Sequence, residues 1–176
     1  MFKHNHSFIV ARFQPFHYGH KSLVDKMIRE SMTCTIVIGS SQESRTIKNP
    51  FTCNERIFMI KNIYGNLPYL NIFCLEDIKN NDEWYNYVLN NIKDKSNMFA
   101  EPDAYYCGGI EEGEWFNKGK LKIEILDRTT QSNIKNISGT KIRNMMKLKN
   151  SEWESFIPEN NRKYLKDIIK NNNIFN

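Results

Sequence analysis

The sequence predicts one α/β domain: a doubly wound, mostly parallel sheet of five strands with helices on both faces. Two observations predict this class. Short apolar runs alternate with longer segments of helical periodicity, which is typical of parallel strands joined by helices. A chain of 176 residues is long enough for one sizeable core, and no repeat, low-complexity linker or change in composition divides it. Residues 1–176 are therefore expected to form a single domain.

Five runs are expected to be strands. The first, at residues 8–11, is apolar throughout, as in strands that are buried on both faces. The fifth, at 121–126, alternates apolar and polar side chains. The three strands between them are expected at 33–39, 70–75 and 103–107.

Helices are expected between and after these strands. Apolar side chains recur at the spacing of one helix face in residues 21–30. Similar periodicity predicts helices at 54–64, 82–93, 138–149 and 158–171. The acidic stretch 111–114 is expected to be a solvated loop or a short helix, and Trp115 and Trp153 are expected to be packing residues.

Composition and charge restrict the classes of function. A hydrophobic content of 40% and an aromatic content of 12% argue against disorder. The net charge of +5 fits binding of anionic metabolites, and no block of Lys and Arg favours a nucleic-acid partner. Because no stretch has the apolar length of a signal peptide or a membrane span, the protein is expected to be cytoplasmic, without a membrane partner.

The four cysteines, Cys34, Cys53, Cys74 and Cys107, are widely spaced, with no CxxC pair and no nearby histidine. A zinc site or a thioredoxin-like motif is therefore not expected. Cys34, Cys74 and Cys107 fall in strand-like runs and are expected to be buried, reduced thiols.

The most informative stretch is 9–20, Ile-Val-Ala-Arg-Phe-Gln-Pro-Phe-His-Tyr-Gly-His, where the first strand ends and a helix begins. A strand, a tight turn and a helix N-terminus place backbone N–H groups and the helix dipole where they face an anion. His17 and His20 lie three residues apart where the helix opens, so they share a face. Arg12 stands at the carboxyl end of the strand, where ligands bind in open α/β sheets. Either histidine alone would be an ordinary polar residue, but together these groups suit a polyphosphate.

A second polar stretch, 39–52, leaves the second predicted strand and carries two cations, Arg45 and Lys48. Small hydroxyl groups beside backbone N–H groups can cradle a phosphate, and Lys or Arg can neutralise it. Composition alone favours a mobile surface loop. Thr52 and Glu55 have the pattern of a capping box for the next helix, so neither needs a catalytic role.

Asp77 follows the third predicted strand, and Trp84 lies seven residues further on, in the next predicted helix. An aspartate can accept hydrogen bonds from a carboxamide, and an indole face can stack on a pyridinium ring. From sequence alone, however, a tryptophan such as Trp84 is more often part of the core.

Ser138 stands at the start of a predicted helix whose first turn holds Thr140. Ser138 can cap this helix, and its free N–H groups then point at an anion. Arg143 lies three residues beyond Thr140 on the same face. Alone, this would be a plain helix start. Gly108 and Gly109 end the fourth strand, where they form a turn or let a nucleoside approach the backbone closely.

These stretches together resemble the HxGH nucleotidylyltransferase superfamily. The string His-Tyr-Gly-His at 17–20 is similar to its first signature, and Ile-Ser-Gly-Thr-Lys-Ile-Arg at 137–143 is similar to its second, ISxTxxR. The longer strings at 12–20 and 39–52 most resemble the archaeal-type nicotinamide-mononucleotide adenylyltransferases. That family usually has Gly where Ala11 stands and often Arg where Lys48 stands; lysine keeps the charge without a bidentate grip. The resemblance extends over about residues 8–169.

The resemblance implies a Rossmann-like domain that transfers the adenylyl group of ATP to nicotinamide mononucleotide, giving NAD and pyrophosphate. It implies catalytic roles for charged side chains at the phosphates: Arg12, His17, His20, Lys48 and Arg143. It implies ATP contacts from the two signatures and the glycine pair: Phe13, Gln14, His17, His20, Gly108, Gly109, Ser138, Thr140 and Arg143. It implies mononucleotide contacts from the second loop and a base pocket: Gly39, Ser40, Ser41, Lys48, Asn49, Asp77 and Trp84.

The phosphate of the mononucleotide is already an anionic nucleophile, so the reaction needs no general base and depends on positioning and charge stabilisation. No protein side chain is expected to ligate a metal; Mg²⁺ or another divalent cation would be held by phosphates and water. A homo-oligomer is the expectation carried over from relatives. Three alternatives stay open: nicotinic acid mononucleotide as acceptor, another phosphorylated acceptor such as phosphopantetheine or FMN, and a nucleotide sensor without turnover.

Overall fold

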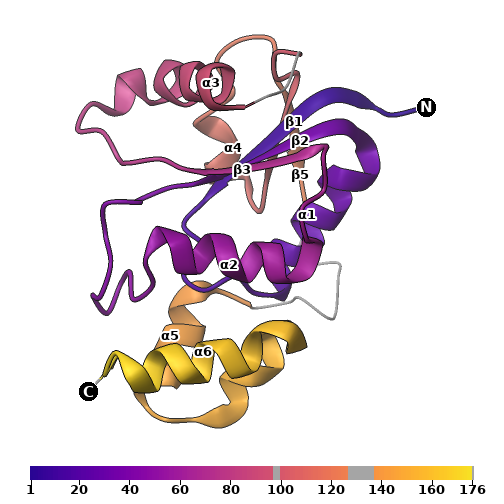
Figure 1. Ribbon diagram of the computed structural model, residues 1–176. Coiled ribbons are helices and arrows are strands. Elements are labelled where there is room, and N and C mark those ends of the chain that lie inside the picture. Colours follow the sequence, from indigo (N-terminus) through magenta and orange to yellow (C-terminus); the bar gives the residue numbers. More distant parts are fainter. Residues whose placement is uncertain (97–99, 127–136, 176) are drawn as a thin grey trace.

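The computed structural model describes residues 1–96, 100–126 and 137–175, with a sheet of five strands at its centre (Figure 1). The strands are β1 (His4–Ala11), β2 (Ser31–Ile38), β3 (Leu70–Cys74), β4 (Ala104–Cys107) and β5 (Lys122–Ile125). All neighbouring strands are parallel, in the order β3-β2-β1-β4-β5. The predicted parallel sheet of five strands is therefore confirmed.

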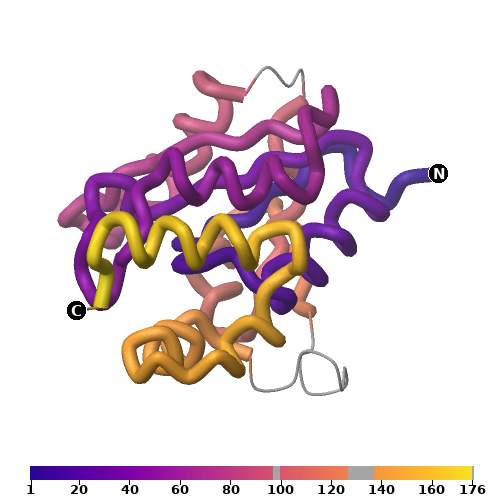
Figure 2. The backbone as a smooth tube through the Cα atoms, turned by 60° about the horizontal axis from the view of Figure 1, so that its bottom comes forward, coloured from indigo at the N-terminus to yellow at the C-terminus, as the bar shows by residue number. Residues whose placement is uncertain are grey.

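Helices cover both faces of this sheet. They are α1 (Tyr18–Glu30), α2 (Cys53–Tyr64), α3 (Trp84–Lys95), α4 (Ile110–Glu114), α5 (Gly139–Lys147) and α6 (Glu159–Asn171), with short 3₁₀ turns η1 (Asn81–Glu83) and η2 (Ser151–Phe156). α3 and α4 lie on one face, α1 and α2 lie on the other, and α5 and α6 form a further layer beyond α2 (Figures 1 and 2). Within the described ranges, no helix is long and apolar enough to cross a membrane.

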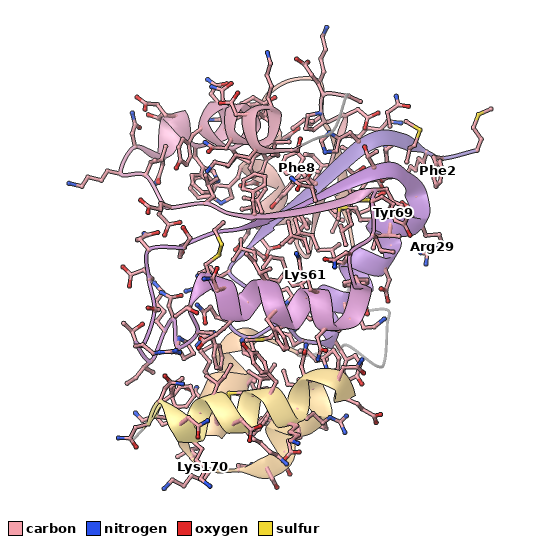
Figure 3. All side chains as sticks on the ribbon, in the orientation of Figure 1. Phe2, Phe8, Arg29, Lys61, Tyr69 and Lys170 are labelled. Carbon is pink, nitrogen blue, oxygen red and sulfur yellow. A yellow bond between two sulfur atoms is a disulfide. The ribbon has the colours of Figure 1, made fainter. Side chains whose placement is uncertain are left out.

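The core lies on both sides of β1, because successive side chains of a strand point to opposite faces. Phe8 packs with Val88 and Phe116 on the side of α3 and α4 (Figure 3). Ile9 belongs to the larger core on the other side, which includes Val24 of α1. This confirms the prediction that the first strand is buried on both faces.

Two elements, β1 and α1, begin at least three residues earlier than the sequence predicts. β1 starts at His4 rather than at residue 8, since its first half contains polar side chains that are buried with partners. The His6 ring bonds to the Thr35 hydroxyl at 2.9 Å, and the Ser7 hydroxyl bonds to another serine hydroxyl at 2.6 Å. α1 starts at Tyr18 rather than at residue 21, because a side chain of the preceding turn caps it.

The cysteine prediction was correct for two residues and wrong for one. Cys34 and Cys107 are buried, reduced thiols, and burial raises the pKa of Cys34 to about 12. Cys74, expected to be reduced, forms a disulfide with Cys53. The carboxyl end of β3 lies beside the first turn of α2, and the two Cα atoms are 6.2 Å apart (Figure 3). Nothing in the spacing of the two residues along the chain signals this contact.

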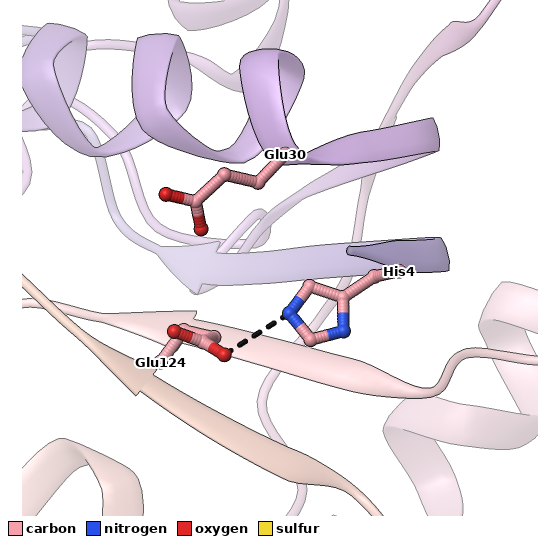
Figure 4. A group of neighbouring side chains, drawn as sticks. All are labelled: His4, Glu30 and Glu124. Carbon is pink, nitrogen blue, oxygen red and sulfur yellow. Dashed lines mark hydrogen bonds and ion pairs between the residues drawn. The ribbon is translucent and has the colours of Figure 1, made fainter. Parts of the chain in front are cut away.

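A group of charged side chains, here called the amino-end cluster, lies at the amino end of the sheet: Lys3, His4, Lys26, Glu30 and Glu124. Glu124 accepts from His4 Nε2 at 3.0 Å and pairs with Lys3 Nζ at 2.6 Å (Figure 4). Lys26 pairs with Glu30 at 2.9 Å and reaches the second oxygen of Glu124 at 3.4 Å. Each carboxylate of the cluster is therefore neutralised by at least one ammonium group.

Candidate active site

A cavity of about 490 Å³ opens at the carboxyl ends of β1, β2 and β4. β1 lies between β2 and β4, so the chain winds in one direction from β1 to β3 and in the other to β4 and β5. Ligands of open α/β sheets bind at such a point of reversal. Most side chains that the sequence predicted for substrate binding line this cavity: Arg12, Phe13, Gln14, His17, His20, Gly39, Ser40, Asp77, Trp84, Ser138, Thr140 and Arg143.

The turn after β1 holds His17 and His20 face to face. His17 is the N-cap of α1: the His20 N–H donates to His17 Nδ1 at 3.3 Å, and the His17 N–H donates to His20 Nδ1 at 3.4 Å. The rings stack with centroids 3.7 Å apart. Since Nδ1 accepts in both, a neutral ring carries its proton on Nε2, where it is a donor suited to a phosphate oxygen. A Cβ at Gly19 would lie 3.0 Å from the His17 ring, which explains the glycine of the signature.

The second signature packs directly against this turn. Ser138 caps α5, as the sequence predicts. Arg143 donates from Nη1 to the Gln14 carbonyl at 2.8 Å and from Nη2 to the Thr140 hydroxyl at 3.1 Å, which confirms that Arg143 and Thr140 share a face. A Cβ at Gly139 would lie 2.9 Å from Arg143 Nη1 and 3.1 Å from the Gln14 carbonyl. The close docking of the two signatures therefore requires a glycine there.

Three arginines, Arg12, Arg56 and Arg143, lie at or beneath the cavity. Among the described residues, none of them is hydrogen-bonded to a carboxylate. Arg12 donates to the Asn49 side-chain oxygen at 3.3 Å. Burial, and then the charge of Arg12, lowers the pKa of Arg143. Burial lowers the pKa of Arg56 to about 10, with Asp77 acting in the opposite direction and Arg12 in the same one. Like charges held this close favour an anionic ligand, because an anion would relieve their repulsion.

Arg56 was missed by the sequence reasoning. Its side chain, in α2, is fully buried, and among the described residues it donates to backbone carbonyls alone. Nη1 bonds to Arg12 O at 2.9 Å and to Gly39 O at 2.8 Å, Nη2 bonds to Ser40 O at 3.2 Å, and Nε bonds to Thr52 O at 3.2 Å. The available signal was an arginine on the apolar face of a predicted helix.

The second loop differs from its predicted role as a phosphate cradle. The amide of Gly39 donates to a β1 carbonyl at 3.0 Å, and that of Ser41 donates to a carbonyl after β3 at 3.1 Å. The amide of Ser40 donates to Asp77 Oδ1 at 3.1 Å. The backbone continues the pairing of the parallel strands, so these amides already have acceptors. From this loop, Gly39 and Ser40 line the cavity, together with Arg12 of the turn after β1.

The rest of the loop is built by local contacts. Thr52 and Glu55 form the predicted capping box, with bonds of 2.8 and 3.3 Å. Glu55 also forms an ion pair with Arg45, which neutralises the charge of this arginine within the loop. Asn49 is buried and accepts a hydrogen bond from Arg12, whereas Lys48 is exposed. Asn49, Lys48 and Ser41 are not part of the cavity lining.

The far side of the cavity is formed by aromatic and acidic side chains. Trp84 is half-buried at the start of α3 and lines the cavity, as does Asp77. Trp115, expected to be a packing residue, is 47% exposed and also lines the cavity, so that expectation was wrong. Glu112 lines it too and accepts the amide of Gly108 at 2.8 Å.

Gly108 and Gly109, predicted to contact ATP, lie just outside the lining. Gly109 precedes α4, and a Cβ placed on it would meet no atom within 4 Å. Packing against the protein therefore does not require a glycine at position 109, and the contact of this pair with ATP stays a prediction.

A parallel sheet with a paired-histidine turn and an arginine-bearing helix start at one cavity defines the class of α/β nucleotidyltransferases. Comparison with known proteins agrees, because the cytidylyltransferase-like family matches residues 8–145. The nicotinamide-nucleotide adenylyltransferase of Methanococcus vannielii is 37% identical over 155 residues, covering 87% of this chain and 83% of the relative. That of Archaeoglobus fulgidus is 32% identical over 169 residues, covering 92% and 91%. The chain belongs to the nicotinamide-nucleotide adenylyltransferases of the cytidylyltransferase-like family.

Solved structures share the fold. A bifunctional NMN adenylyltransferase/ADP ribose pyrophosphatase from Francisella tularensis aligns with a TM-score of 0.73 and 21% identity, over 97% of this chain. NadR protein in complex with NAD and AMP-PNP aligns with a TM-score of 0.64 and 20% identity, over 90% of this chain. The chain spans 50% of the first protein and 46% of the second, about half the length of each.

Proposed function

We propose that this protein transfers the adenylyl group of ATP to nicotinamide mononucleotide and releases pyrophosphate, forming NAD for its biosynthesis. One observation carries the proposal: Arg143 of the second signature bonds to the Gln14 carbonyl in the histidine turn, at 2.8 Å. The donors suited to a triphosphate are thereby gathered in one cavity, whose lining also includes Trp84 and Asp77. The names of the curated relatives support the same reaction.

In the proposed reaction, a phosphate oxygen of the mononucleotide attacks the α-phosphorus of ATP. A new P–O bond forms, the bond from the α-phosphorus to the α,β-bridging oxygen breaks, and pyrophosphate leaves with the electron pair. His17 and His20 donate from Nε2 to the α- and β-phosphates and stabilise the charge that develops there. Arg143 and Thr140 hold the departing pyrophosphate. Because the nucleophile is already anionic, no side chain has to remove a proton.

The acceptor is proposed to lie between the ends of β2 and β3. The Ser40 side chain and Arg12 contact its phosphate. Lys48, although it lies outside the cavity lining, is proposed to contribute its positive charge to the reacting phosphates from the loop. Trp84 stacks on the pyridinium ring, with Trp115 as a second aromatic wall. Asp77 accepts from the carboxamide, and its bond to the Ser40 amide orients it for that contact.

A divalent cation, Mg²⁺ by expectation, is proposed to bind with the substrates, where it would neutralise part of the phosphate charge. The fit rests on the donor set: the carboxylates among the described lining residues are Asp77 and Glu112, and both already accept backbone amides. Phosphates and water would therefore supply most ligands, as is usual for Mg²⁺. In support, a structure of the Francisella tularensis bifunctional enzyme is complexed with AMP and a manganese ion; it is 27% identical, with a TM-score of 0.61 over 84% of this chain and 42% of that one.

The test is pyrophosphate release from ATP and Mg²⁺ with a panel of acceptors: nicotinamide mononucleotide, nicotinic acid mononucleotide, phosphopantetheine and FMN. Turnover with the pyridine mononucleotides is expected, and the ratio of their kcat/KM values would decide the amide preference. Turnover with phosphopantetheine or FMN alone would retain the reaction class and refute the base pocket. Nucleotide binding without release from any acceptor would support a sensor instead.

We further propose a single domain over residues 1–176, a homo-oligomer and a cytoplasmic location. Light scattering during size-exclusion chromatography would give the oligomeric state, and cell fractionation would give the location.

A further inference from the structure

We infer that Arg56 is a positioning residue for adenylyl transfer: its buried guanidinium fixes the turns after β1 and β2, and thereby places Arg12 and Ser40 at the acceptor phosphate. The inference rests on the proposed function. It concerns a side chain that lies beneath the cavity and does not line it.

The contacts of Arg56 are unusual for a buried cation. Buried arginines are normally paired with carboxylates, whereas all the hydrogen bonds of Arg56 to described residues go to backbone carbonyls. The carbonyls belong to three segments that are distant in sequence: the end of β1 (Arg12), the end of β2 (Gly39 and Ser40) and the start of α2 (Thr52). The planar fork of a guanidinium can bond in several fixed directions at once, which an ammonium cannot reproduce.

The turns that Arg56 holds have strained backbones. Phe13, which follows Arg12, has φ of 52°, and Ser40 has φ of 49°. Left-handed conformations are rare for side chains other than glycine and persist where the surrounding structure enforces them. Arg56 bonds to the carbonyl just before Phe13 and to the carbonyl of Ser40 itself. One buried side chain therefore constrains both strained positions.

These turns carry groups that the proposed reaction uses. Arg12 projects from the residue whose carbonyl Arg56 holds, and Ser40 is held at its carbonyl by Arg56 and at its amide by Asp77. Through Ser40, Arg56 is thus connected both to the groups proposed for the acceptor phosphate and to Asp77, which is proposed for the base. A shift of about 1 Å in such groups can cost on the order of 10²-fold in rate.

A purely structural role makes a different prediction, and Asn161 provides the matched control. Asn161 is also fully buried and donates to a backbone carbonyl of α2, that of Met59, at 2.9 Å, but from the side of α6. Asn161→Ala should lower Tm and leave the kinetic constants of the folded enzyme unchanged. A structural Arg56 would behave in the same way.

The main variant is Arg56→Lys, which keeps the charge and loses the fork. We expect it to fold, to raise KM for the mononucleotide roughly tenfold, to lower kcat by roughly 10 to 10²-fold, and to change KM for ATP by less than about threefold. Kinetic constants within about twofold of the wild type, with a Tm loss like that of Asn161→Ala, would overturn the inference.

A second variant covers the case in which lysine does not fold. Arg56→Ala leaves a space that millimolar methylguanidinium can enter. KM for the mononucleotide should recover with methylguanidinium and not with methylammonium at the same concentration, as monitored on folded protein by circular dichroism. Equal recovery, or none, would contradict the positioning role.

Binding separates failure of the inference from failure of the proposed function. The Tm shift given by the mononucleotide, with and without ATP, requires no turnover. A wild-type shift that Arg56→Lys loses, without pyrophosphate release by either protein, would refute the proposed function and retain Arg56 as a positioning residue. A shift of equal size in both proteins would refute the inference, and no shift in the wild type would refute both.

Discussion

The two ends of the sheet use the same kinds of side chain in opposite ways. At the amino end, the His4 ring bonds to Glu124, near Glu30 (Figure 4). Lys3 and Lys26 pair with these two carboxylates, so each carboxylate has a cationic partner. At the carboxyl end, Arg56 and Arg143 bond to carbonyl and hydroxyl oxygens, among the described contacts. The first arrangement is neutral within itself, whereas the second has positive charge that its hydrogen-bond partners do not cancel.

This difference separates a structural use of charge from a functional one. A cluster whose charges cancel gains little from an added ion, because lysines already occupy the carboxylates. A cluster of like charges is destabilised by its own repulsion until an anion binds. Such a cluster, which lowers the stability of the free protein, is therefore expected at a binding site. The amino-end cluster is therefore expected to govern stability, and the histidine turn with its arginines is expected to govern catalysis.

The strongest test replaces one histidine at each end. His20→Ala should lower kcat roughly 10² to 10³-fold, because a donor to the developing phosphate charge is lost. Tm should fall only slightly, as one cap contact of α1 disappears. His4→Ala should lower Tm and leave kcat intact. Steady-state kinetics and thermal denaturation of both variants would check this, and an inactive His4→Ala enzyme would break the comparison.

Arg143→Lys should have the next largest effect. Lysine keeps the charge but cannot bond to the Gln14 carbonyl and the Thr140 hydroxyl in the geometry of a guanidinium. We expect kcat/KM for ATP to fall roughly 10 to 10²-fold. The release of pyrophosphate should slow in single-turnover experiments. An enzyme with wild-type kcat/KM would show that charge alone suffices at this position.

Trp84→Ala should act on one substrate. KM for nicotinamide mononucleotide should rise about tenfold, because a ring contact of about 1–2 kcal/mol is lost. KM for ATP should change much less and serves as the internal control. Equal increases in both KM values would remove Trp84 from the base pocket.

Glu124→Gln should have no effect on kcat and a modest effect on stability. The Glu124 pKa is lowered: burial acts to raise it, but the hydrogen bonds from Lys3 and His4 and the nearby ammonium charges together outweigh burial. A carboxyl with a depressed pKa in the folded state stabilises the protein above its unfolded pKa, and this contribution is lost as pH falls through the folded value. Glu124→Gln should thus unfold about 1–2 kcal/mol more easily at pH 7, with the difference shrinking below about pH 4. Urea denaturation at pH 7 and below about pH 4 would measure the difference in free energy of unfolding between the variant and the wild type. The same difference at both pH values would contradict the role of the charge.

The sequence predicts the fold well because strands and helices have different periodicities, and those are local properties. The runs at 33–39 and 70–75 are parallel strands within one residue or two at each end. The signature residues His17, His20, Thr140 and Arg143 all line one cavity, because short spacings at the ends of elements fix their positions.

The residues that sequence reasoning missed depend on contacts between distant segments. Arg56 bonds to carbonyls up to 44 positions away, and its place on the apolar face of a helix marks it as unusual without identifying those partners. Trp115 was assigned to packing because nothing local shows that its helix borders the cavity. The amides of the second loop were expected to face phosphate, but register with β1 and β3 decides where they point. Pairings across the sheet are set by tertiary structure, which periodicity does not encode.

The bond between Cys53 and Cys74 closes a ring of chain that runs from the first residue of α2 to the last residue of β3 and contains the turn at 65–69. A protease that cuts this turn would leave two fragments that migrate as one band without reductant and separate when it is added. Since Arg56 lies within the ring, a nicked enzyme would keep this side chain tethered to the segment that leads into Asp77.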